Sequence, residues 1–305
     1  MAPAKTDLDA TSLFRVDGMV AVITGGGTGI GLTMARVLAC NGAARVYLLG
    51  RRLGVLQEAA AEHLKIFVPL QCDVTSHASL QSAAETIARE AGHINLLIAN
   101  SGIGGPGAFW NPSLSVSDLR AAIFTQEHMD GMSNTLHVNV TGAFFTILAF
   151  IELLDAGNVA ALKGGFGAPL SEGSTVPSIQ SQVIVTSSIA AFSRMPMSSP
   201  SYAASKAAIL HLTKQASSNM ARYGIRANAL APGLFPSELA QVLIGGRDPG
   251  TEVYEDPRFI PARRFGGDKE MAGTLLYLAS RTGSYCNGMV LMADGGRSGV
   301  MLSSY

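Results

Sequence analysis

The chain of 305 residues has little charge, few cysteines and a single tryptophan. Charged residues make up 14% of it and the formal net charge is zero, which argues against a nucleic acid or an anionic membrane held by bulk charge. Its six histidines show no ligand spacing, so we expect no catalytic metal. Three cysteines, without paired or metal-like spacing, are expected to be reduced core thiols in a reducing compartment: Cys40, Cys72 and Cys286.

Segments that would direct the chain into a membrane are also missing. Residues 1–18 are polar and mixed, without the basic-then-apolar layout of a signal sequence. The most apolar helical stretch, Ala143–Leu154, is too short to span a bilayer and carries Glu152. We therefore expect a soluble, cytoplasmic protein.

Apolar sequence, in contrast, is abundant, with 48% hydrophobic residues. Its Val-, Ile- and Leu-rich runs are mostly continuous, which is typical of parallel strands covered on both faces, and helical patterns lie between them. This alternation predicts an α/β fold, a single Rossmann-like domain over residues 1–305 with a doubly wound parallel sheet of about seven strands. The expected strands are 19–24, 45–49, 66–71, 95–99, 182–186, 226–230 and 289–292, and the expected helices are 29–41, 53–63, 76–91, 136–154, 201–222 and 268–279.

Four stretches lie outside this alternation. Residues 1–16 form an N-terminal extension, and residues 234–265 are expected to form a lid over the substrate. The connection 102–134 and the Gly-, Ser- and Pro-rich residues 155–181 are expected to be long loops, and loops of that length are usually functional or mobile.

A glycine-rich segment follows the first expected strand and opens the first helix. In this position, glycines allow a tight turn and a close approach to a pyrophosphate, which the helix N-terminus then attracts. A plain Gly-rich turn is the alternative. The expected cofactor-binding residues in this segment, Thr24–Gly31, are Gly25, Gly27, Thr28, Gly29, Ile30 and Gly31.

The second strand ends in Gly50-Arg51-Arg52, which bears on the choice of cofactor. An NAD site has an acid near this point for the ribose 2′-hydroxyl, whereas an arginine accommodates the 2′-phosphate of NADP. Arg51 and Arg52 therefore favour NADP(H) over NAD(H), unless both simply face solvent. The glycine segment itself holds no basic residue, so the phosphate would depend on these two arginines.

Two further strand ends offer cofactor contacts. Asp73, followed by Val74, could accept a hydrogen bond from the adenine amino group, or it could cap the helix that starts near Ser76. The fourth strand ends in the small residues expected where a strand meets a cofactor, Asn100, Ser101 and Gly102.

Tyr202 and Lys206 are four residues apart on an expected helix, so both side chains lie on one face. A nearby ammonium stabilises a phenolate and lowers the pKa of the phenol, which lets a tyrosine exchange a proton near neutral pH. The spacing alone is common, and its value depends on the other motifs.

Together and in this order, the motifs resemble those of the short-chain dehydrogenase/reductase family over residues 17–297. The family's Thr-Gly-x-x-x-Gly-x-Gly matches residues 24–31, its Asn-Ala-Gly matches 100–102 with Ser101 in place of alanine, and its Tyr-x-x-x-Lys matches Tyr202 and Lys206. Its Pro-Gly matches Pro232-Gly233, and its closing Asp/Asn-Gly-Gly matches residues 294–296.

The resemblance implies catalytic roles for Asn139, Ser188, Tyr202 and Lys206. Ser188 and Tyr202 would bind the substrate carbonyl, Tyr202 would protonate the alkoxide, and Lys206 would hold the ribose and lower the Tyr202 pKa. Asn139 would position a water that links Lys206 to solvent. Ser188 precedes Tyr202 by fourteen residues, one more than in many members, and Ser187 is the lesser candidate. Near the nicotinamide, the resemblance implies Pro232, Gly233, Leu234 and, more loosely, Ser237.

The substrate is less readable. Apolar residues near the implied site suggest a largely apolar ketone or alcohol, such as a polyketide-like, acyl or terpenoid-like compound, although they could equally belong to the core or an interface. These residues are Ile103, Phe109, Trp110, Phe192, Met195, Met197, Leu234, Phe235 and Leu239.

The leading hypothesis is an NADPH-dependent carbonyl reductase, with the direction of reaction left open. The alternatives are a cofactor-binding protein without redox turnover and a dehydratase or isomerase on the same fold. The family also implies a homodimer or homotetramer, paired through the helices at 136–154 and 201–222. The tail, residues 297–305, could reach a neighbour's site or fray.

Overall fold

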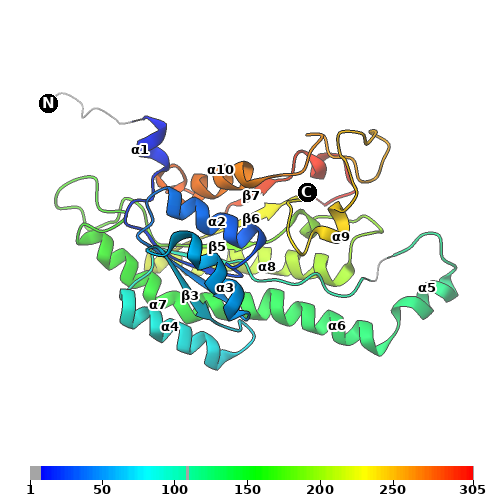
Figure 1. Cartoon of the computed structure of the whole chain (residues 1–305), viewed down its shortest axis with the longest axis horizontal. Helices are drawn as coiled ribbons and strands as arrows, with labels where there is room; N and C mark the ends of the chain where they lie inside the picture. Colours follow the sequence, from blue (N-terminus) through cyan, green and yellow to red (C-terminus); the bar gives the residue numbers. More distant parts are fainter. Residues whose placement is uncertain (1–7, 108–109, 305) are drawn as a thin grey trace.

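The computed structural model describes residues 8–107 and 110–304, in which seven parallel strands form one sheet with helices on both faces (Figure 1). The strand order is β3-β2-β1-β4-β5-β6-β7. This is the doubly wound α/β sheet that the sequence predicts. The strands are β1 (Val20–Thr24), β2 (Arg45–Gly50), β3 (Phe67–Gln71), β4 (Leu96–Ala99), β5 (Gln182–Thr186), β6 (Arg226–Pro232) and β7 (Val290–Ala293).

Most of the expected helices begin and end within a few residues of their expected positions. The α-helices are α1 (Ala10–Phe14), α2 (Gly29–Cys40), α3 (Leu53–Ala60), α4 (His77–Ala91), α5 (Val116–Ile123), α6 (Gln126–Leu136), α7 (Ala143–Leu162), α8 (Pro200–Asn219), α9 (Gln241–Ile244) and α10 (Asp268–Ala279). Short 3₁₀ turns are η1 (Ala61–His63), η3 (Ile189–Ala191), η4 (Ala221–Tyr223), η5 (Arg281–Gly283) and η6 (Arg297–Gly299), and η2 (His137–Gly142) is π-helical.

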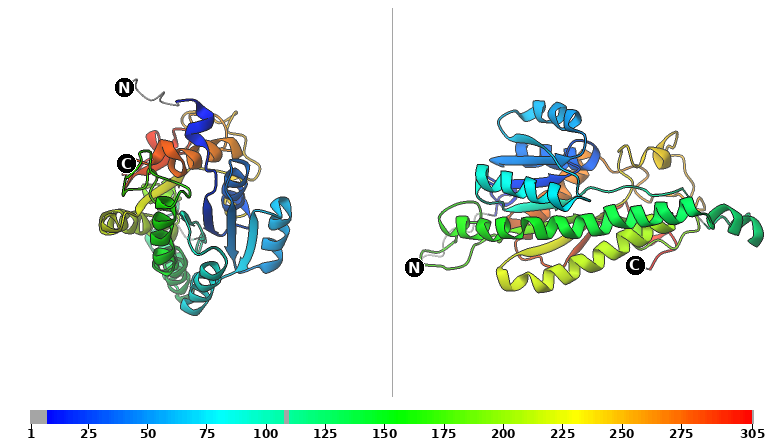
Figure 2. Two further views of the ribbon diagram at one scale, coloured as in Figure 1. Left: turned by 90° about the vertical axis from the view of Figure 1, so that its left-hand side faces the viewer. Right: turned by 90° about the horizontal axis from the view of Figure 1, so that it is seen from below.

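The sheet separates two apolar cores, because successive side chains of a strand point to opposite faces. In β1, Ala21 and Ile23 pack with α2, α3 and α10, whereas Val20 and Val22 pack with α4, α7 and α8. All five residues of β1 are buried, as the continuous apolar run predicts. Figure 2 shows these two helical layers on either side of the sheet.

The longest helix corrects two predicted loops. α6, η2 and α7 form one helix of 37 residues, Gln126–Leu162, so the expected loop 155–181 starts only after Leu162. The connection 102–134, expected to be a loop, holds α5 and most of α6. Gly157, inside the expected loop, lies within this helix and allows close packing: a Cβ there would lie 2.1 Å from the Ile94 carbonyl oxygen.

The length of this helix bears on whether the chain could cross a membrane. By length and composition it is long and apolar enough to cross a bilayer, so the expectation that the apolar stretch is too short was wrong. A core helix passes the same test, and α7 packs against β4, β5, α4 and α8.

The three cysteines are free, but only one is a core thiol. Cys72 is buried, Cys286 is partly exposed, and Cys40 is exposed at the end of α2. The prediction of core thiols was therefore wrong for Cys40, whose position at the helix end turns it to the surface.

The described part of the C-terminal tail pairs with a loop of its own chain, which neither alternative for the tail anticipated. Ser303 forms an antiparallel bridge with Ser193, and the Ser304 amide donates to the Phe192 carbonyl at 2.7 Å. The guanidinium of Arg194 donates to the Ser303 carbonyl through Nε and Nη2, at 3.1 and 2.8 Å. The tail thus holds the loop that leads from β5 to α8.

Candidate active site

The glycine segment between β1 and α2 has the backbone that a pyrophosphate cradle requires. Gly25 and Gly29 have φ values of +66° and +52°, a region that side chains disfavour. A Cβ at Gly31 would lie 2.1 Å from the Gly25 carbonyl oxygen, so only glycine fits. The first turn of α2 has unpaired N–H groups, because helix N-termini lack intrahelical acceptors. These features fit a dinucleotide phosphate.

Asn100 and Ser101 at the end of β4 hold this segment in place. The Asn100 side chain donates to the carbonyls of Thr24 and Gly25 at 3.1 and 3.4 Å, and the backbone N–H groups of Asn100 and Ser101 donate to Thr24 Oγ1. The side-chain amide of Asn100 therefore supports the cradle. The Ser101 hydroxyl oxygen would lie 3.3 Å from a Cβ at Gly25, so it borders the same turn.

The two arginines after β2 differ in their surroundings. Arg52 pairs with Glu238, with Nη2 3.1 Å from Oε2, and both side chains are exposed. Arg51, also exposed, lies close enough to Asp73 to help lower the pKa of that carboxyl, although hydrogen bonds from Thr75 contribute more. Arg51 and Asp73, which follow neighbouring strands, thus lie near each other.

Asp73 does not cap the following helix. Its Oδ1 accepts from the backbone and hydroxyl of Thr75 at 2.9 and 2.7 Å, whereas Ser76 is the N-cap of α4 and accepts from the Ser79 amide. The capping alternative is therefore wrong. Next to it, Val74 packs against the helix at Gly142, where a Cβ would lie 3.0 Å from Val74 Cγ2.

Tyr202 and Lys206 lie on one face of α8, whose N-cap is Ser199. Lys206 is buried, its Nζ donates to the Thr186 carbonyl at 2.9 Å, and it lies 5.6 Å from the centroid of the Tyr202 ring. Burial lowers the pKa of Lys206 to about 8. The ammonium is thus held between the end of β5 and the tyrosine.

The pKa of Tyr202 differs from the expectation. Burial of the phenol raises its pKa above the usual value of 10, and the nearby Ser188 side chain acts in the opposite direction. The prediction that Lys206 lowers this pKa is not met in the structure, because the cost of burying the phenolate dominates.

The two candidate serines have separate environments. Ser187 is buried and its hydroxyl donates to the Lys206 carbonyl at 2.9 Å, which ties β5 to α8. Ser188 is partly exposed, accepts from the Ala190 amide at 3.1 Å, and lies close enough to Tyr202 to oppose the rise in the pKa of that phenol. Of the two, Ser188 is the one placed beside the phenol.

Asn139 lies in the π-helical turn η2, a rare geometry that often occurs at functional sites. Its side chain accepts from the Ile103 amide at 2.8 Å and donates to the Ile103 carbonyl and the Ser205 hydroxyl at 2.9 and 3.0 Å. Both of its N–H groups are thus used, which leaves one acceptor position at Oδ1. Glycine at position 102 leaves room here, since a Cβ would lie 3.2 Å from Asn139 Oδ1 and 3.4 Å from Lys206 Nζ.

The Pro232-Gly233 segment extends the site at the end of β6. A Cβ at Gly233 would lie 2.7 Å from the Asp294 Cα, so glycine lets the segment after β7 pack here. Leu234 follows and is partly exposed. Ser237 lies over the glycine segment, with its Cβ 3.0 Å from where a Cβ at Gly29 would be.

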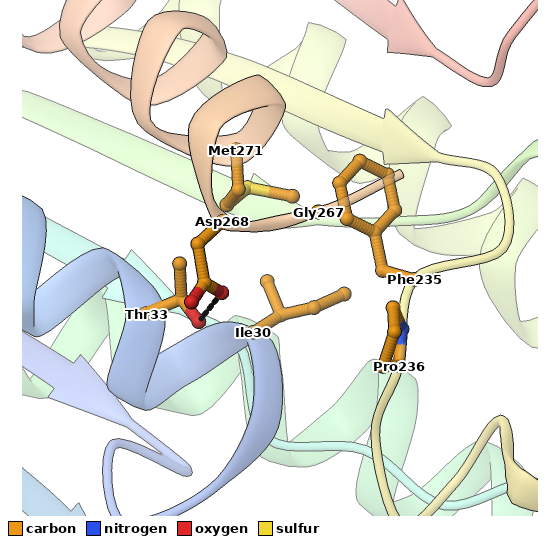
Figure 3. A pocket seen from close by; sticks show the side chains of 7 residues that line it. All are labelled: Ile30, Thr33, Phe235, Pro236, Gly267, Asp268 and Met271. Atoms are coloured by element: carbon orange, nitrogen blue, oxygen red, sulfur yellow. Dashed lines mark hydrogen bonds between the residues drawn. The ribbon is translucent and has the colours of Figure 1, made fainter. Parts of the chain in front are cut away.

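The expected apolar pocket is only partly assembled. Phe235 is buried and lines a different cavity of about 260 Å³ between α2 and α10 (Figure 3), so its assignment to the substrate pocket was wrong. Its ring packs against Gly266, where a Cβ would lie 2.5 Å from the ring atoms, so only glycine fits there. Trp110, Met197 and Leu239 are exposed, Ile103, Phe192 and Met195 are partly exposed, and Phe109 lies outside the described residues.

Sequence reasoning missed several supporting residues. Ser205 links Asn139 to α8, the Thr186 carbonyl holds Lys206, Arg194 binds the tail, and Glu238 reaches Arg52. The position of Ser205 beside Lys206 was the only available signal. Among the described residues, no group of three or more His, Cys, Asp or Glu side chains is placed to hold a metal ion.

Known proteins are similar to this chain over most of its length. Residues 19–164 match the family model described as short chain dehydrogenase, and residues 170–298 match the model described as enoyl-(acyl carrier protein) reductase. The chain is 58% identical to the short-chain dehydrogenase/reductase SAT3 of Stachybotrys chartarum over 272 residues, 89% of this chain and 100% of that protein.

Solved structures share the fold. The RhlG/NADP active-site complex of Pseudomonas aeruginosa superposes with a TM-score of 0.73 at 26% identity, covering 94% of this chain and 99% of that one. A 7α-hydroxysteroid dehydrogenase complexed with NADH and 7-oxo glycochenodeoxycholic acid also has a TM-score of 0.73, at 24% identity, covering 94% and 97%. The first neighbour and the family match support a nicotinamide cofactor without deciding between NADP and NAD, whereas the second, at 24% identity, shows the fold alone.

Proposed function

This chain belongs to the short-chain dehydrogenase/reductase family, and we propose that it reduces a ketone of a largely apolar small molecule, or oxidises the matching alcohol, with NADP(H). Its relatives make it an oxidoreductase that acts on CH–OH or C=O groups with a nicotinamide cofactor. The observation that carries the proposal is the arrangement of Ser188, Tyr202 and Lys206 at the carboxyl ends of the strands, where open α/β sheets bind ligands.

Tyr202 is the proposed general acid and base. Its phenol, with Ser188, would hydrogen-bond the substrate oxygen, and it would donate a proton as negative charge develops there. The raised pKa of Tyr202 favours the protonated form, which is the form required for reduction. The cofactor, when bound, supplies the hydride.

Lys206 and Asn139 would support the tyrosine. With a pKa of about 8, Lys206 is mostly protonated at pH 7, so its charge stabilises the phenolate left after proton transfer. Lys206 would also bind the ribose hydroxyls. The remaining acceptor position on Asn139 Oδ1 is the proposed contact for a water that carries protons to Lys206.

NADP(H) is favoured by the two arginines after β2. Arg51 and Arg52 would hold the 2′-phosphate, Asp73 the adenine amino group, and the cradle Gly25–Gly31 the pyrophosphate. Asn100, Ser101 and Gly102 would border the groove, and Val74 the adenine. The nicotinamide would lie by Pro232, Gly233, Leu234 and Ser237.

Exposed apolar side chains on α7 suggest how the chain assembles. We propose a homodimer or homotetramer that buries the exposed face of α7, where Phe145, Leu148, Val159 and Leu162 are 44–46% exposed. We also propose that the enzyme is soluble and cytoplasmic, and that residues 1–305 form one domain in which the segment 234–265 covers the substrate.

A panel of apolar ketones, screened by NADPH absorbance with product identification, tests the function. Tyr202→Phe should lower turnover by about 10²- to 10⁴-fold, the usual contribution of a general acid, with little change in NADPH affinity. Tyr285→Phe changes a fully exposed tyrosine and is the control. Near-normal turnover in Tyr202→Phe would show that the acid lies elsewhere.

A further inference from the structure

One short segment of the proposed lid, Ser237–Leu239, contacts three loops that follow different strands. Ser237 lies against Gly29 of the glycine segment, and Leu239 lies against the loop after β4, where a Cβ at Gly104 would be 3.2 Å from Leu239 Cδ1. Between them, Glu238 reaches Arg52 at the end of β2. The segment therefore touches the carboxyl ends of three strands. Figure 3 shows the residues that lead into it, Phe235 and Pro236, beside Ile30 of α2.

Arg52 consequently has two possible anionic partners. In the structure its Nη2 donates to both carboxylate oxygens of Glu238, at 3.1 and 3.4 Å. The proposed function gives the same guanidinium to the 2′-phosphate of NADP(H). The five N–H donors of the guanidinium would have to be divided between the Glu238 carboxylate and the 2′-phosphate. These two anions would also repel each other if both were bound to Arg52. NAD(H), which has no 2′-phosphate, makes no such demand on Arg52.

We propose that Glu238 is a cofactor-specificity residue whose carboxylate competes with the 2′-phosphate of NADP(H) for Arg52. The inference rests on the proposed function, because it requires the adenosine end of the cofactor to lie beside Arg51 and Arg52. Glu238 weakens NADPH binding and leaves NADH binding unchanged. It also means that NADPH breaks the only ion pair found, within the described chain, between the segment 234–265 and the turn after β2, whereas NADH leaves that pair closed.

The expected size of the effect follows from the exposure of the pair. The side chains of Arg52 and Glu238 are 60% and 66% exposed, and exposed ion pairs contribute little because water and salt screen them. Releasing Arg52 should therefore tighten NADPH binding by about two- to fivefold at low salt. The gain should shrink as salt increases, since the screening length shortens.

Calorimetric titration of the full-length protein with NADPH and with NADH, without substrate, tests this. Glu238→Gln should lower the NADPH dissociation constant by about two- to fivefold and leave that of NADH unchanged. Glu255→Gln, an exposed acid of the same segment, should change neither. In a protein that already carries Arg52→Ala, Glu238→Gln should no longer affect NADPH, because the shared partner is gone.

Two results would overturn the inference alone: equal changes for both cofactors, or weaker NADPH binding in Glu238→Gln, which would mean that Glu238 orients Arg52 for the phosphate. If the unsubstituted protein bound neither cofactor, the proposed function would fail and this inference with it. Circular dichroism of each variant checks that the fold is intact.

Discussion

Burial of the charged Lys206 side chain lowers the free energy of unfolding, and this effect can be measured. Burial lowers the pKa of Lys206 from 10.5 to about 8, while in the unfolded chain the ordinary value applies. Each pKa unit corresponds to about 1.4 kcal/mol, so burying the protonated ammonium costs the folded state about 3 kcal/mol at pH 7. Lys206→Met removes that charge and fills a similar volume.

The substitution also removes a hydrogen bond. Lys206 Nζ donates to the Thr186 carbonyl at 2.9 Å, and leaving a buried acceptor without a donor costs about 1–3 kcal/mol. We therefore expect Lys206→Met to be up to about 2 kcal/mol more stable than the unsubstituted protein at pH 7, and to have lost turnover. Lys214→Met, an exposed lysine on the same helix, is the control.

The pH dependence of stability separates the cost of burying the charge from the effect of the lost hydrogen bond. Below pH 8 both the folded and unfolded states bind the Lys206 proton, so the full penalty applies; between pH 8 and 10.5 the folded state releases it first, and stability rises with pH. The unsubstituted protein should thus gain about 3 kcal/mol relative to Lys206→Met over that range, in urea unfolding without added cofactor. A difference between the two proteins that stays constant from pH 7 to 10.5 would refute the reasoning.

Three further substitutions test other parts of the site. Gly31→Ala should lower the free energy of unfolding in urea by about 1–3 kcal/mol and weaken NADPH binding, because its Cβ would clash with the Gly25 carbonyl. The control, Gly273→Ala on the exposed face of α10, should instead raise that free energy by about 0.5–1 kcal/mol. Ser187→Ala should cost about 1 kcal/mol through its lost bond to the Lys206 carbonyl, measured by the same unfolding assay, whereas Ser188→Ala should lower turnover more than stability. Arg194→Ala should speed amide exchange at Ser304 about tenfold in hydrogen-exchange mass spectrometry, since two hydrogen bonds to the tail are lost.

The strands and the cofactor end of the site were readable from the sequence because each depends on a local pattern. Continuous apolar runs locate parallel strands, and glycines between a strand and a helix locate the cradle. The glycine at position 31 is required by a contact only six residues away, with Gly25, which is why such a motif is compact enough to see.

The features that could not be predicted from the sequence depend on contacts between residues far apart in the chain. Gly157 lies inside a helix because glycine is required where the helix packs against Ile94, and nothing in the sequence around Gly157 indicates that contact. The same holds for Phe235, whose ring packs against Gly266, and for Glu238, which meets Arg52 186 residues away. The Tyr202 pKa was misjudged because the spacing to Lys206 reveals a neighbouring charge but not the burial that opposes it.

The π-helical turn η2 limits how the gene for this chain can change. Most one-residue insertions and deletions are tolerated in loops, but here the surplus residue lies inside a helix of 37 residues. Deleting Val138 would remove the wide turn and restore regular α-helical geometry, while the flanking halves would keep their present faces, because the turn itself absorbs the surplus residue. Asn139 would then shift relative to the flanking turns and would lose its hydrogen bond to Ser205. In an alignment of distant sequences, a gap at this point would therefore mark the loss of that contact.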